Sequence, residues 1–281
     1  MTESSSKQFT VVDHAVSGET FELRKHPIWD MWVTHPVPEN LEKYYQSDDY
    51  ISHTDSRNTF FDRIYQTTKA FRLKRKVRML EKLLGSRGKL LDIGAGTGDL
   101  VKQAISMGWQ AEGVEPNTTA REKAQQKGIV LKENGKAFPK KAFDVITLWH
   151  VLEHLPELED SIQQISSLLK PSGILIVAVP NFKSWDAKYY KEYWAGYDAP
   201  RHLWHFSKDA LKAIFSKNNF QLNKIYPMQL DAFYVALLSE KYKHGRMRWL
   251  TAGYVGLTSN LKARRSGEYS SLIYVLKKAP E

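Results

Sequence analysis

Between residues 89 and 180, short apolar runs alternate with longer stretches of helical periodicity, and this alternation limits the possible folds more than any other feature of the sequence. Strands fit the runs at 89–94, 110–115, 129–133, 143–149 and 174–180, and helices fit the intervals at 98–107, 117–127 and 157–170. Strands that alternate with helices of crossover length are typical of βαβ units around a parallel sheet. The sequence therefore predicts an α/β fold with a doubly wound sheet.

The flanking segments complete a single large domain with a cap. A helix is predicted over residues 59–84, and two further strands at 220–226 and 270–278. The mostly helical residues 230–265 between those strands form an expected insertion. We predict an N-terminal cap over residues 1–58, with a disordered tail to about residue 8, small strands and a helix from Glu39. The main domain is then residues 59–281.

The composition excludes several kinds of chemistry. The chain has 281 residues and no cysteine, which rules out disulfides, thiolate metal sites and cysteine nucleophiles, and we expect no metal. No apolar run has the length of a membrane span or of a signal peptide, so we expect a cytoplasmic protein.

A formal net charge of +10 makes polyanions possible partners. Much of the excess lies at residues 69–78 and 241–248, where basic runs usually form solvated helix faces. No known nucleic-acid-reading module accompanies the charge, so nucleic acid is an unlikely partner.

The segment DIGAGTG, residues 92–98, joins the first strand of the alternating region to the next helix. Its glycines permit a tight turn and let the backbone approach a ligand closely. Amide groups at the start of the following helix have no intrahelical acceptor and can bind ligand oxygens. Because glycine turns are also used for structural reasons, the pattern alone leaves a ligand site and a plain turn about equally favoured.

Three acids favour an adenosine cofactor with a positive charge. Glu115 ends the second strand, where a carboxylate can accept hydrogen bonds from both ribose hydroxyls. The glycines are spaced Gly-x-Gly-x-Gly, whereas the dinucleotide fingerprint is Gly-x-Gly-x-x-Gly. Asp92 suits a cation, and Asp99 would repel a pyrophosphate. S-adenosylmethionine (SAM) is therefore favoured, with a dinucleotide as the alternative.

Several segments between residues 89 and about 220 resemble the class I SAM-dependent methyltransferases, and in particular a diverse bacterial group. The segments are DIGAGTG (92–98), VEPN (114–117), FDVITLWHVLEHL (143–155), LLKPSGILIVAVPN (168–181) and DAPRHLWHFS (198–207). The resemblance implies a Rossmann-like sheet of seven strands in the order 3-2-1-4-5-7-6, with the seventh strand antiparallel.

The same resemblance implies roles for individual residues. Residues that would border the methionine part of SAM are Asp92, Gly94, Ala95, Gly96 and Gly98. Glu115 would bind the ribose, Pro116 and Asn117 would flank the adenine, and Asn134 matches the polar position near the adenine amine. Trp149 and His150 would lie against the cofactor, although Trp149 could instead fill the core.

The N-terminal segment resembles relatives in which a small zinc ribbon precedes the methyltransferase domain. The surrounding sequence is kept, but His26 and Trp29 occupy what look like former Cys-x-x-Cys positions. The resemblance therefore implies a cysteine-free relic of the ribbon that binds no zinc.

The stretch 194–205 follows the fifth strand and contains the best candidates for acceptor chemistry. His202 is the first candidate for a general base and His205 the second, while Arg201 suits an anionic group on the acceptor. Structural bracing of the loop by Arg201 and His202 is an equally good alternative. His150 and His154 are weaker candidates for the base.

These observations predict a methyltransferase that acts on a small molecule: a sugar, a quinone-like phenol or a lipid-linked intermediate. A dinucleotide-dependent oxidoreductase and a non-catalytic SAM-binding protein are the alternatives. The insertion 230–265 combines Tyr, Trp and Leu with Arg and Lys. It suits a lid over a hydrophobic acceptor, which we favour, or contact with a membrane surface.

Overall fold

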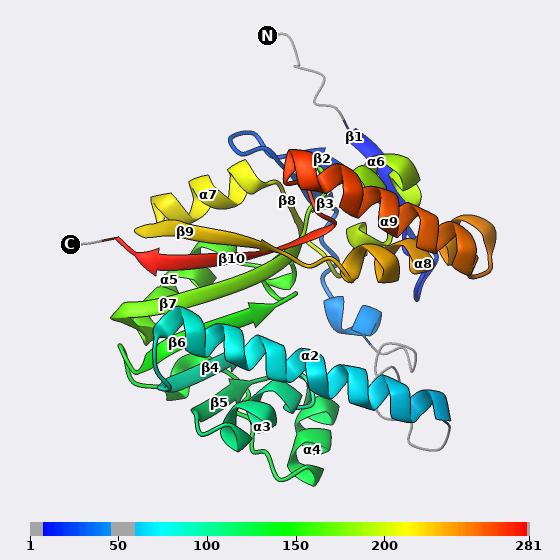
Figure 1. Cartoon of the computed structure of the whole chain (residues 1–281). Coiled ribbons are helices and arrows are strands. Elements are labelled where there is room, and N and C mark those ends of the chain that lie inside the picture. The colour runs from blue at the N-terminus through cyan, green and yellow to red at the C-terminus, as the bar shows by residue number, and fades with distance from the viewer. Residues whose placement is uncertain (1–7, 46–59, 280–281) are drawn as a thin grey trace, which may run out of the picture.

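A six-stranded mixed sheet forms the centre of the computed structural model, which describes residues 8–45 and 60–279 (Figure 1). The strands lie in the order β5-β4-β6-β7-β10-β9. They are β4 (Lys89–Ile93), β5 (Gln110–Val114), β6 (Phe143–Trp149), β7 (Leu169–Pro180), β9 (Phe220–Pro227) and β10 (Ser271–Lys278). Strands β5, β4, β6 and β7 are parallel, and β10 is antiparallel to both of its neighbours. The predicted fold class and the position of the antiparallel strand are confirmed.

The strand predicted at 129–133 is reduced to a short pairing beside β5, where the amide of Lys132 donates to the carbonyl of Gly113 at 3.0 Å and its carbonyl accepts from the amide of Glu115 at 2.9 Å. Only Lys132 forms a β-bridge there, with Val114, so the main sheet has six strands rather than seven. Ile129 and Leu131 of the apolar run are buried against Val101 at the edge of the sheet. Alternation of apolar residues does not distinguish this packing from a strand.

Helices cover both faces of the sheet. Val77 and Leu80 of α2 (Phe60–Leu84) and Leu100 of α3 (Asp99–Ser106) belong to the core on one face. The core on the other face includes α5 (Leu158–Leu168) and α7 (Lys208–Lys217), while α4 (Thr118–Gln126) follows β5. The predicted crossover helices are confirmed within a few residues at each end.

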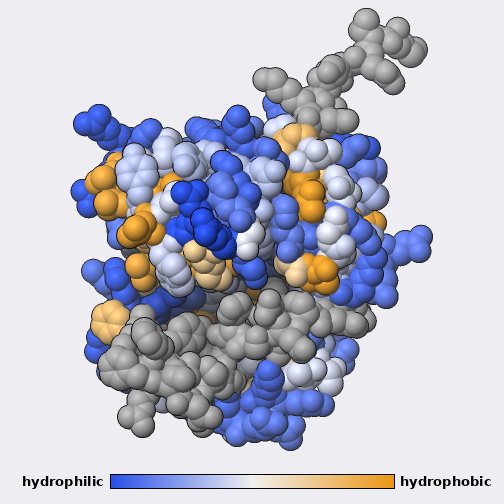
Figure 2. All heavy atoms as spheres, turned by 90° about the vertical axis from the view of Figure 1, so that its right-hand side faces the viewer, coloured by the Kyte–Doolittle hydropathy of each residue, from blue (hydrophilic) through white to orange (hydrophobic). Residues whose placement is uncertain are grey.

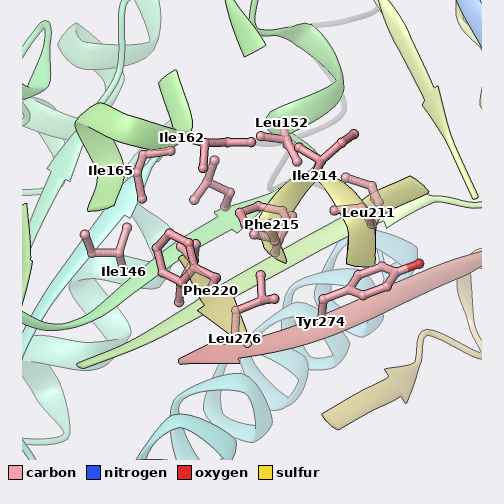
Figure 3. Packing of buried hydrophobic residues seen from close by; sticks show 14 of the residues in the cluster. Ile146, Leu152, Ile162, Ile165, Leu211, Ile214, Phe215, Phe220, Tyr274 and Leu276 are labelled. Carbon is pink, nitrogen blue, oxygen red and sulfur yellow. The ribbon is translucent and has the colours of Figure 1, made fainter. Parts of the chain in front are cut away.

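Strand β7 is buried on both faces. Leu175, Val177 and Val179 join one core cluster, and Ile174, Ile176 and Ala178 join the other. Figure 3 shows the first cluster, where side chains of α5 and α7 meet the sheet around Ile146, Phe220 and Leu276. Burial of each large aliphatic side chain contributes about 1.5–3 kcal/mol. Burial on both faces explains why the run 174–180 is apolar throughout rather than alternating.

A second, antiparallel sheet forms the cap. Its order is β1-β2-β3-β8, from β1 (Gln8–Val12), β2 (Thr20–Lys25), β3 (Met31–His35) and β8 (Trp204–Phe206). Because β8 belongs to the segment DAPRHLWHFS, the cap and the predicted acceptor loop share one sheet. The helix predicted from Glu39 appears as the 3₁₀-helix η1 (Leu41–Tyr45). The rest of that helix and the tail 1–7 lie outside the described residues.

At the positions that resemble a lost zinc site, the rings of His26 and Trp29 stack with centroids 4.7 Å apart. The backbone amides of Ile28 and Trp29 each donate a hydrogen bond to Nδ1 of His26 at 3.2 Å. Aromatic packing and a local turn therefore hold this segment in place. The origin of the cap as a zinc-ribbon relic stays a prediction.

The remaining elements surround the ends of the strands. Short helices follow β7 as α6 (Trp185–Tyr190), η4 (Lys191–Tyr193) and η5 (Ala195–Tyr197), and other short turns are η2 (Gly135–Ala137) and η3 (Leu152–His154). The helical insertion between β9 and β10 contains α8 (Asp231–His244) and α9 (Trp249–Ser266). In the described part of the chain, no helix has the length and apolarity needed to cross a membrane.

Candidate functional site

The glycine loop connects β4 to α3 in a conformation that requires glycine. Gly94, Gly96 and Gly98 all have positive φ, at 68°, 53° and 74°. A Cβ on Gly94 would lie 2.4 Å from Val151, whereas a Cβ on Gly96 would meet no atom of the described residues within 4 Å. The amide of Ala95 donates to the carbonyl of Val114 at 2.9 Å, which ties the loop to β5. The space beside Gly96 is therefore the open part of the loop.

Glu115 links this loop to the start of the next helix. Its Oε2 accepts a hydrogen bond from the amide of Gly96 at 2.8 Å, and its Oε1 accepts one from the amide of Asn117 at 2.9 Å. The carboxylate is half-buried, and each oxygen keeps further lone pairs for a ligand. Asn117 caps α4 through its side-chain oxygen, and Pro116 is exposed. The structure thus brings together the loop and the acid that the sequence paired.

Asn134 lies apart from these contacts and is exposed. Its side-chain oxygen accepts a hydrogen bond from the amide of Lys136 and caps η2. The side-chain amide nitrogen forms no hydrogen bond with the described residues. Its proposed contact with an adenine amine stays a prediction.

Asp92 and Lys76 place opposite charges near the end of β4. Asp92 is 4% exposed and accepts a hydrogen bond from the hydroxyl of Thr147 at 2.6 Å. Burial raises the pKa of Asp92 to about 6, and burial lowers the pKa of Lys76 to about 8. The Lys76 ammonium lies 3.7 Å from the ring centroid of Trp149, which ends β6. The site therefore contains a buried acid and a poorly solvated cation.

Sequence reasoning missed Lys76 because it lies in a basic run that was interpreted as solvated. A signal was present: Lys76 follows Leu73 by three positions and precedes Leu80 by four, which puts it on the apolar face of α2. The indole Nε1 of Trp149 is buried and has no partner among the described residues. Trp149 is half-buried and forms one side of this site, so both its packing and its ligand roles stay open to test.

Asp99, at the start of α3, forms an ion pair with Lys127. Asp99 was expected to repel a pyrophosphate, but Nζ of Lys127 lies 3.0 Å from its Oδ1 and offsets the charge. Thr97 also donates a hydrogen bond to Asp99. Asp99 therefore gives no discrimination between SAM and a dinucleotide.

His150, at the end of β6, is held as a cation between two carboxylates. Its Nδ1 lies 3.2 Å from Oε1 of Glu153, and its Nε2 lies 3.1 Å from Oδ2 of Asp231, the first residue of α8. Burial alone would lower its pKa, but the bonds to Asp231 and Glu153 dominate and raise the pKa to about 10. A protonated imidazole with both nitrogens engaged is not a general base at neutral pH.

Arg201 is buried, with 2% of its surface exposed, and braces the cap against the loop. Its Nη2 contacts Oδ1 of Asp13 at 3.1 Å and Oδ1 of Asp198 at 2.6 Å, and its Nη1 donates to the carbonyl of Tyr44 at 3.2 Å. The guanidinium is thus committed to protein acceptors. These contacts agree with the alternative interpretation of the sequence, in which Arg201 braces the loop and does not bind the acceptor.

His205 is also buried, and it lies within β8 opposite Trp32. Its Nε2 lies 3.0 Å from the hydroxyl of Thr34. Burial, reinforced by the nearby His202, holds the pKa of His205 well below its usual range. The ring is therefore neutral and engaged between the strands of the cap.

His202 is the candidate base with a nitrogen left for chemistry. Its Nδ1 lies 3.0 Å from the carbonyl of Gly196, which can only accept, so Nδ1 carries the hydrogen. Its Nε2 lies 3.9 Å from Asp198 and 4.0 Å from Glu153. The ring of His154 packs edge-on at 4.6 Å, and burial lowers the pKa of His154 to about 4.

The same cluster has the donors of a metal site. Within the described residues, Glu153, His154 and His202 bring one ligand atom each within 4.8 Å of one another. Oε2 of Glu153 is buried and has no partner among those residues. The expectation that the protein binds no metal stays untested.

Comparison with known proteins agrees with this geometry. A family model described as a methyltransferase domain matches residues 64–225. The ubiquinone biosynthesis O-methyltransferase of Actinobacillus pleuropneumoniae serotype 7 (strain AP76) is 33% identical over an alignment of 107 residues, and the match covers 33% of this chain and 46% of that protein. An uncharacterized methyltransferase of Oceanobacillus iheyensis is 34% identical over an alignment of 110 residues, and the match covers 37% of this chain and 52% of that protein. The chain spans about half the length of these curated relatives.

Solved structures support the same fold. A SAM-dependent methyltransferase from Archaeoglobus fulgidus aligns with a TM-score of 0.52 at 19% identity, covering 78% of this chain and all of that one. The similarity to class I SAM-dependent methyltransferases that DIGAGTG and FDVITLWHVLEHL indicated is thereby confirmed, and SAM is the cofactor of that family. The match extends over more than half of the sequence, and the chain belongs to the methyltransferase-domain family.

Proposed function

We propose that this chain transfers the methyl group of SAM to a hydroxyl of a small acceptor molecule, at the carboxyl ends of β4, β5 and β6. One observation carries the proposal: Glu115 bonds both the amide of Gly96 and the amide of Asn117, and a Cβ on Gly96 would meet no atom of the described residues within 4 Å. This arrangement fits the ribose of an adenosine cofactor against an open stretch of backbone.

The charges nearby fit SAM better than a dinucleotide. The amino acid part of SAM carries an ammonium and a carboxylate, and its sulfur carries a further positive charge. Asp92 offers a carboxylate for the cationic groups, and Lys76 offers an ammonium for the carboxylate. A dinucleotide has no ammonium group to match Asp92. The residues present therefore fit SAM.

SAM, when bound, supplies a methyl group already activated by the sulfonium. The protein then has to orient the acceptor and remove a proton from its hydroxyl. Orientation contributes about 7–11 kcal/mol in favourable cases, and a positioned base adds roughly 10²- to 10⁴-fold.

His202 is the base that this proposal favours. The carbonyl of Gly196 fixes its ring, which leaves Nε2 to accept the proton. Carboxylate oxygens of Asp198 and Glu153 lie 3.9 and 4.0 Å from Nε2. Under this proposal His205 and Arg201 support the loop and do not touch the acceptor, because both are engaged within the cap.

Within the three acceptor classes, a phenolic hydroxyl has the most support, since the Actinobacillus relative is named as a ubiquinone biosynthesis O-methyltransferase. That support is limited, because the similarity spans 33% of this chain. A sugar or a lipid-linked intermediate stays open. A non-catalytic SAM-binding protein is the second candidate, since cofactor binding by itself does not require turnover.

Two measurements test the proposal. Thermal unfolding in the presence of SAM, its demethylated product or NAD(P) separates the methyltransferase from the oxidoreductase, because only the true cofactor raises the unfolding temperature. Transfer of labelled methyl from SAM to a panel of phenols, sugars and lipid-linked hydroxyl compounds then identifies the acceptor class. SAM binding without any transfer across all three classes would favour the non-catalytic candidate.

A further inference from the structure

The insertion helix α9 presents an apolar stripe to solvent. Leu250, Tyr254, Leu257 and Leu261 are 93%, 65%, 54% and 49% exposed. Their spacing of four, three and four residues puts them on one face of the helix over roughly 16 Å. We call these four residues the α9 stripe. Four exposed large apolar residues on one helix face are more than isolated surface residues, and such patches mark interaction sites.

The opposite face of α9 is firmly attached to the protein. Ala252, Val255, Gly256 and Ser259 are buried there, and the Ser259 hydroxyl donates to the buried carboxylate of Asp186 at 2.6 Å. The α9 stripe is therefore the outer face of a packed helix. It is not an inner face awaiting closure against this chain, which argues against the lid that the sequence favoured.

The surroundings of the α9 stripe are strongly basic. Residues 241–267 contain seven Lys and Arg and no Asp or Glu. Arg246, Arg264 and Arg265 are exposed, and no carboxylate of the described residues forms an ion pair with them. At the upper left of Figure 2, hydrophobic residues gather beside strongly hydrophilic ones, on the side of the molecule where Figure 1 has α8 and α9. The stripe thus combines exposed leucines with uncompensated positive charge.

Exposed aromatic residues occur on both insertion helices. Trp249, the first residue of α9, precedes Leu250 and is 70% exposed, and Tyr234 of α8, the helix that packs against α9, is 56% exposed. Trp and Tyr are the residues that favour the boundary between lipid headgroups and acyl chains, where an apolar ring and a polar tip are both accommodated.

We propose that the α9 stripe and its basic flanks dock this protein on an anionic lipid bilayer surface. An apolar face of Leu and Trp with Lys and Arg around it enters the headgroup region and attracts anionic lipids. A second copy of the chain fits less well, because a two-fold contact would bring the same basic segment of both copies together. The docking itself does not depend on methyl transfer.

The position of the helices ties this surface to the candidate site. Asp231 begins α8, which packs against α9, and its carboxylate contacts His150 at the end of β6. If the proposed methyl transfer is correct, docking brings the site to acceptors that are held in the bilayer. This extension rests on the proposed function, whereas the docking can be tested alone.

Flotation with lipid vesicles tests the docking directly, using the full chain. Vesicles of phosphatidylcholine are compared with vesicles that also contain phosphatidylglycerol, at low and high salt. The parent is expected to float with the anionic vesicles at low salt, and much less with the neutral ones or at high salt. The double variant Leu250→Glu/Leu257→Glu should lose roughly tenfold or more of its vesicle binding.

Matched controls separate the stripe from general effects. Ile28→Glu/Val16→Glu changes two exposed apolar side chains of the cap, 78% and 41% exposed, and should float like the parent. Arg264→Gln/Arg265→Gln should weaken binding to anionic vesicles, whereas Lys102→Gln/Lys212→Gln, at exposed positions on α3 and α7, should leave it unchanged. Equal unfolding temperatures of all variants establish that each is folded, whatever the outcome for catalysis.

Three results would overturn the proposal. The first is a folded parent that does not float with anionic vesicles. The second is a Leu250→Glu/Leu257→Glu variant that floats as well as the parent. The third is a parent that forms a stable dimer in solution while this variant is a monomer. The last result would assign the α9 stripe to a second copy of the chain. A parent that floats with anionic vesicles but transfers no methyl group to any acceptor would contradict the proposed function and leave the docking proposal in place.

Discussion

Nε2 of His150 lies 3.1 Å from Oδ2 of Asp231, and this contact joins the end of β6 to the first residue of α8 across 81 positions of sequence. The other ring nitrogen faces Glu153 at 3.2 Å, so the imidazolium links one buried acid, Glu153, and one half-buried acid, Asp231. The helical insertion is thereby connected to the loop that follows the cofactor-binding strands.

Replacing Asp231 with Asn should lower the pKa of His150 from about 10, because the ring loses one of its two carboxylate partners. A histidine pKa that is raised in the folded state adds stability in full below its unfolded value of 6.5, and that stability is lost as the pH rises through about 10. The parent should therefore lose more unfolding free energy between these pH values than Asp231→Asn does.

Urea unfolding at a series of pH values measures this difference, and at pH 7 the variant should be less stable by about 1–3 kcal/mol. Asp160→Asn, at an exposed position of α5, is the control and should follow the parent. If the unfolding free energies of the parent and of Asp231→Asn change with pH in the same way, the contact with Asp231 does not keep His150 protonated.

SAM affinity should be highest between about pH 6 and pH 8. Below that range Asp92, with its pKa raised to about 6, becomes protonated and loses its attraction for the cationic groups of SAM. Above it Lys76, with its pKa lowered to about 8, loses the charge that would hold the carboxylate. Calorimetric titration with SAM from pH 5 to about 9.5 measures the fall in affinity at acidic pH and the fall at alkaline pH.

Lys76→Met should weaken SAM binding and remove the fall in affinity at alkaline pH. Lys74→Met, at an exposed position of the same helix, should keep the parent's fall in affinity at both acidic and alkaline pH. If the affinity of Lys76→Met for SAM still falls at alkaline pH, a group other than Lys76 causes that fall.

Arg201→Met should destabilise the fold by about 3–5 kcal/mol, because it leaves Asp13 and Asp198 without their buried partner. Arg24→Met, which removes an exposed ion pair on β2, should cost about 0–1 kcal/mol. Chemical denaturation compares the two variants. A stable Arg201→Met variant with normal SAM affinity and impaired turnover would instead return Arg201 to an acceptor-binding role.

His202→Ala should lower kcat by roughly 10²- to 10⁴-fold and change SAM affinity little, because the ring acts on the acceptor proton. His205→Ala should reduce stability through the lost contact with Thr34, with a much smaller effect on kcat. Steady-state kinetics on an acceptor found with labelled SAM, together with calorimetry, separate the two effects. Equal losses of kcat in both variants would mean that His202 only braces the loop.

The sequence predicted the parallel sheet and the loop–acid pair because both are local patterns. The alternation of strands and helices and the spacing of Gly94, Gly96 and Gly98 each lie within a short segment. The strand predicted at 129–133 is reduced to one bridge between Lys132 and Val114, although Ile129 and Leu131 are buried as they would be in a longer strand. A pattern of burial identifies which side chains are inside, but it does not say which backbone groups pair.

Features that depend on distant contacts could not be predicted. The positive charge on His150 depends on its contact with Asp231. The buried ion pair of Arg201 depends on Asp13, which lies 188 positions away in the sequence. The pairing of β3 with β8, which places His205 within the cap, likewise joins distant segments, since Thr34 and His205 lie 171 positions apart. Only Lys76 left a signal in the sequence, as a cation on the apolar face of a helix.

Calorimetric titration of the parent and of Gly96→Val with SAM tests the central claim most directly. The account predicts one SAM bound per parent chain, competition by its demethylated product, no binding of NAD, and no SAM binding by Gly96→Val. The Cβ of a valine there meets no atom within 4 Å among residues 8–45 and 60–279, but the side chain enters the space assigned to the cofactor. Gly18→Val, at a glycine of the cap with φ 70° and equally open surroundings, controls for backbone strain and should bind SAM normally. Binding of NAD in place of SAM, or unchanged SAM binding by Gly96→Val, would contradict the account.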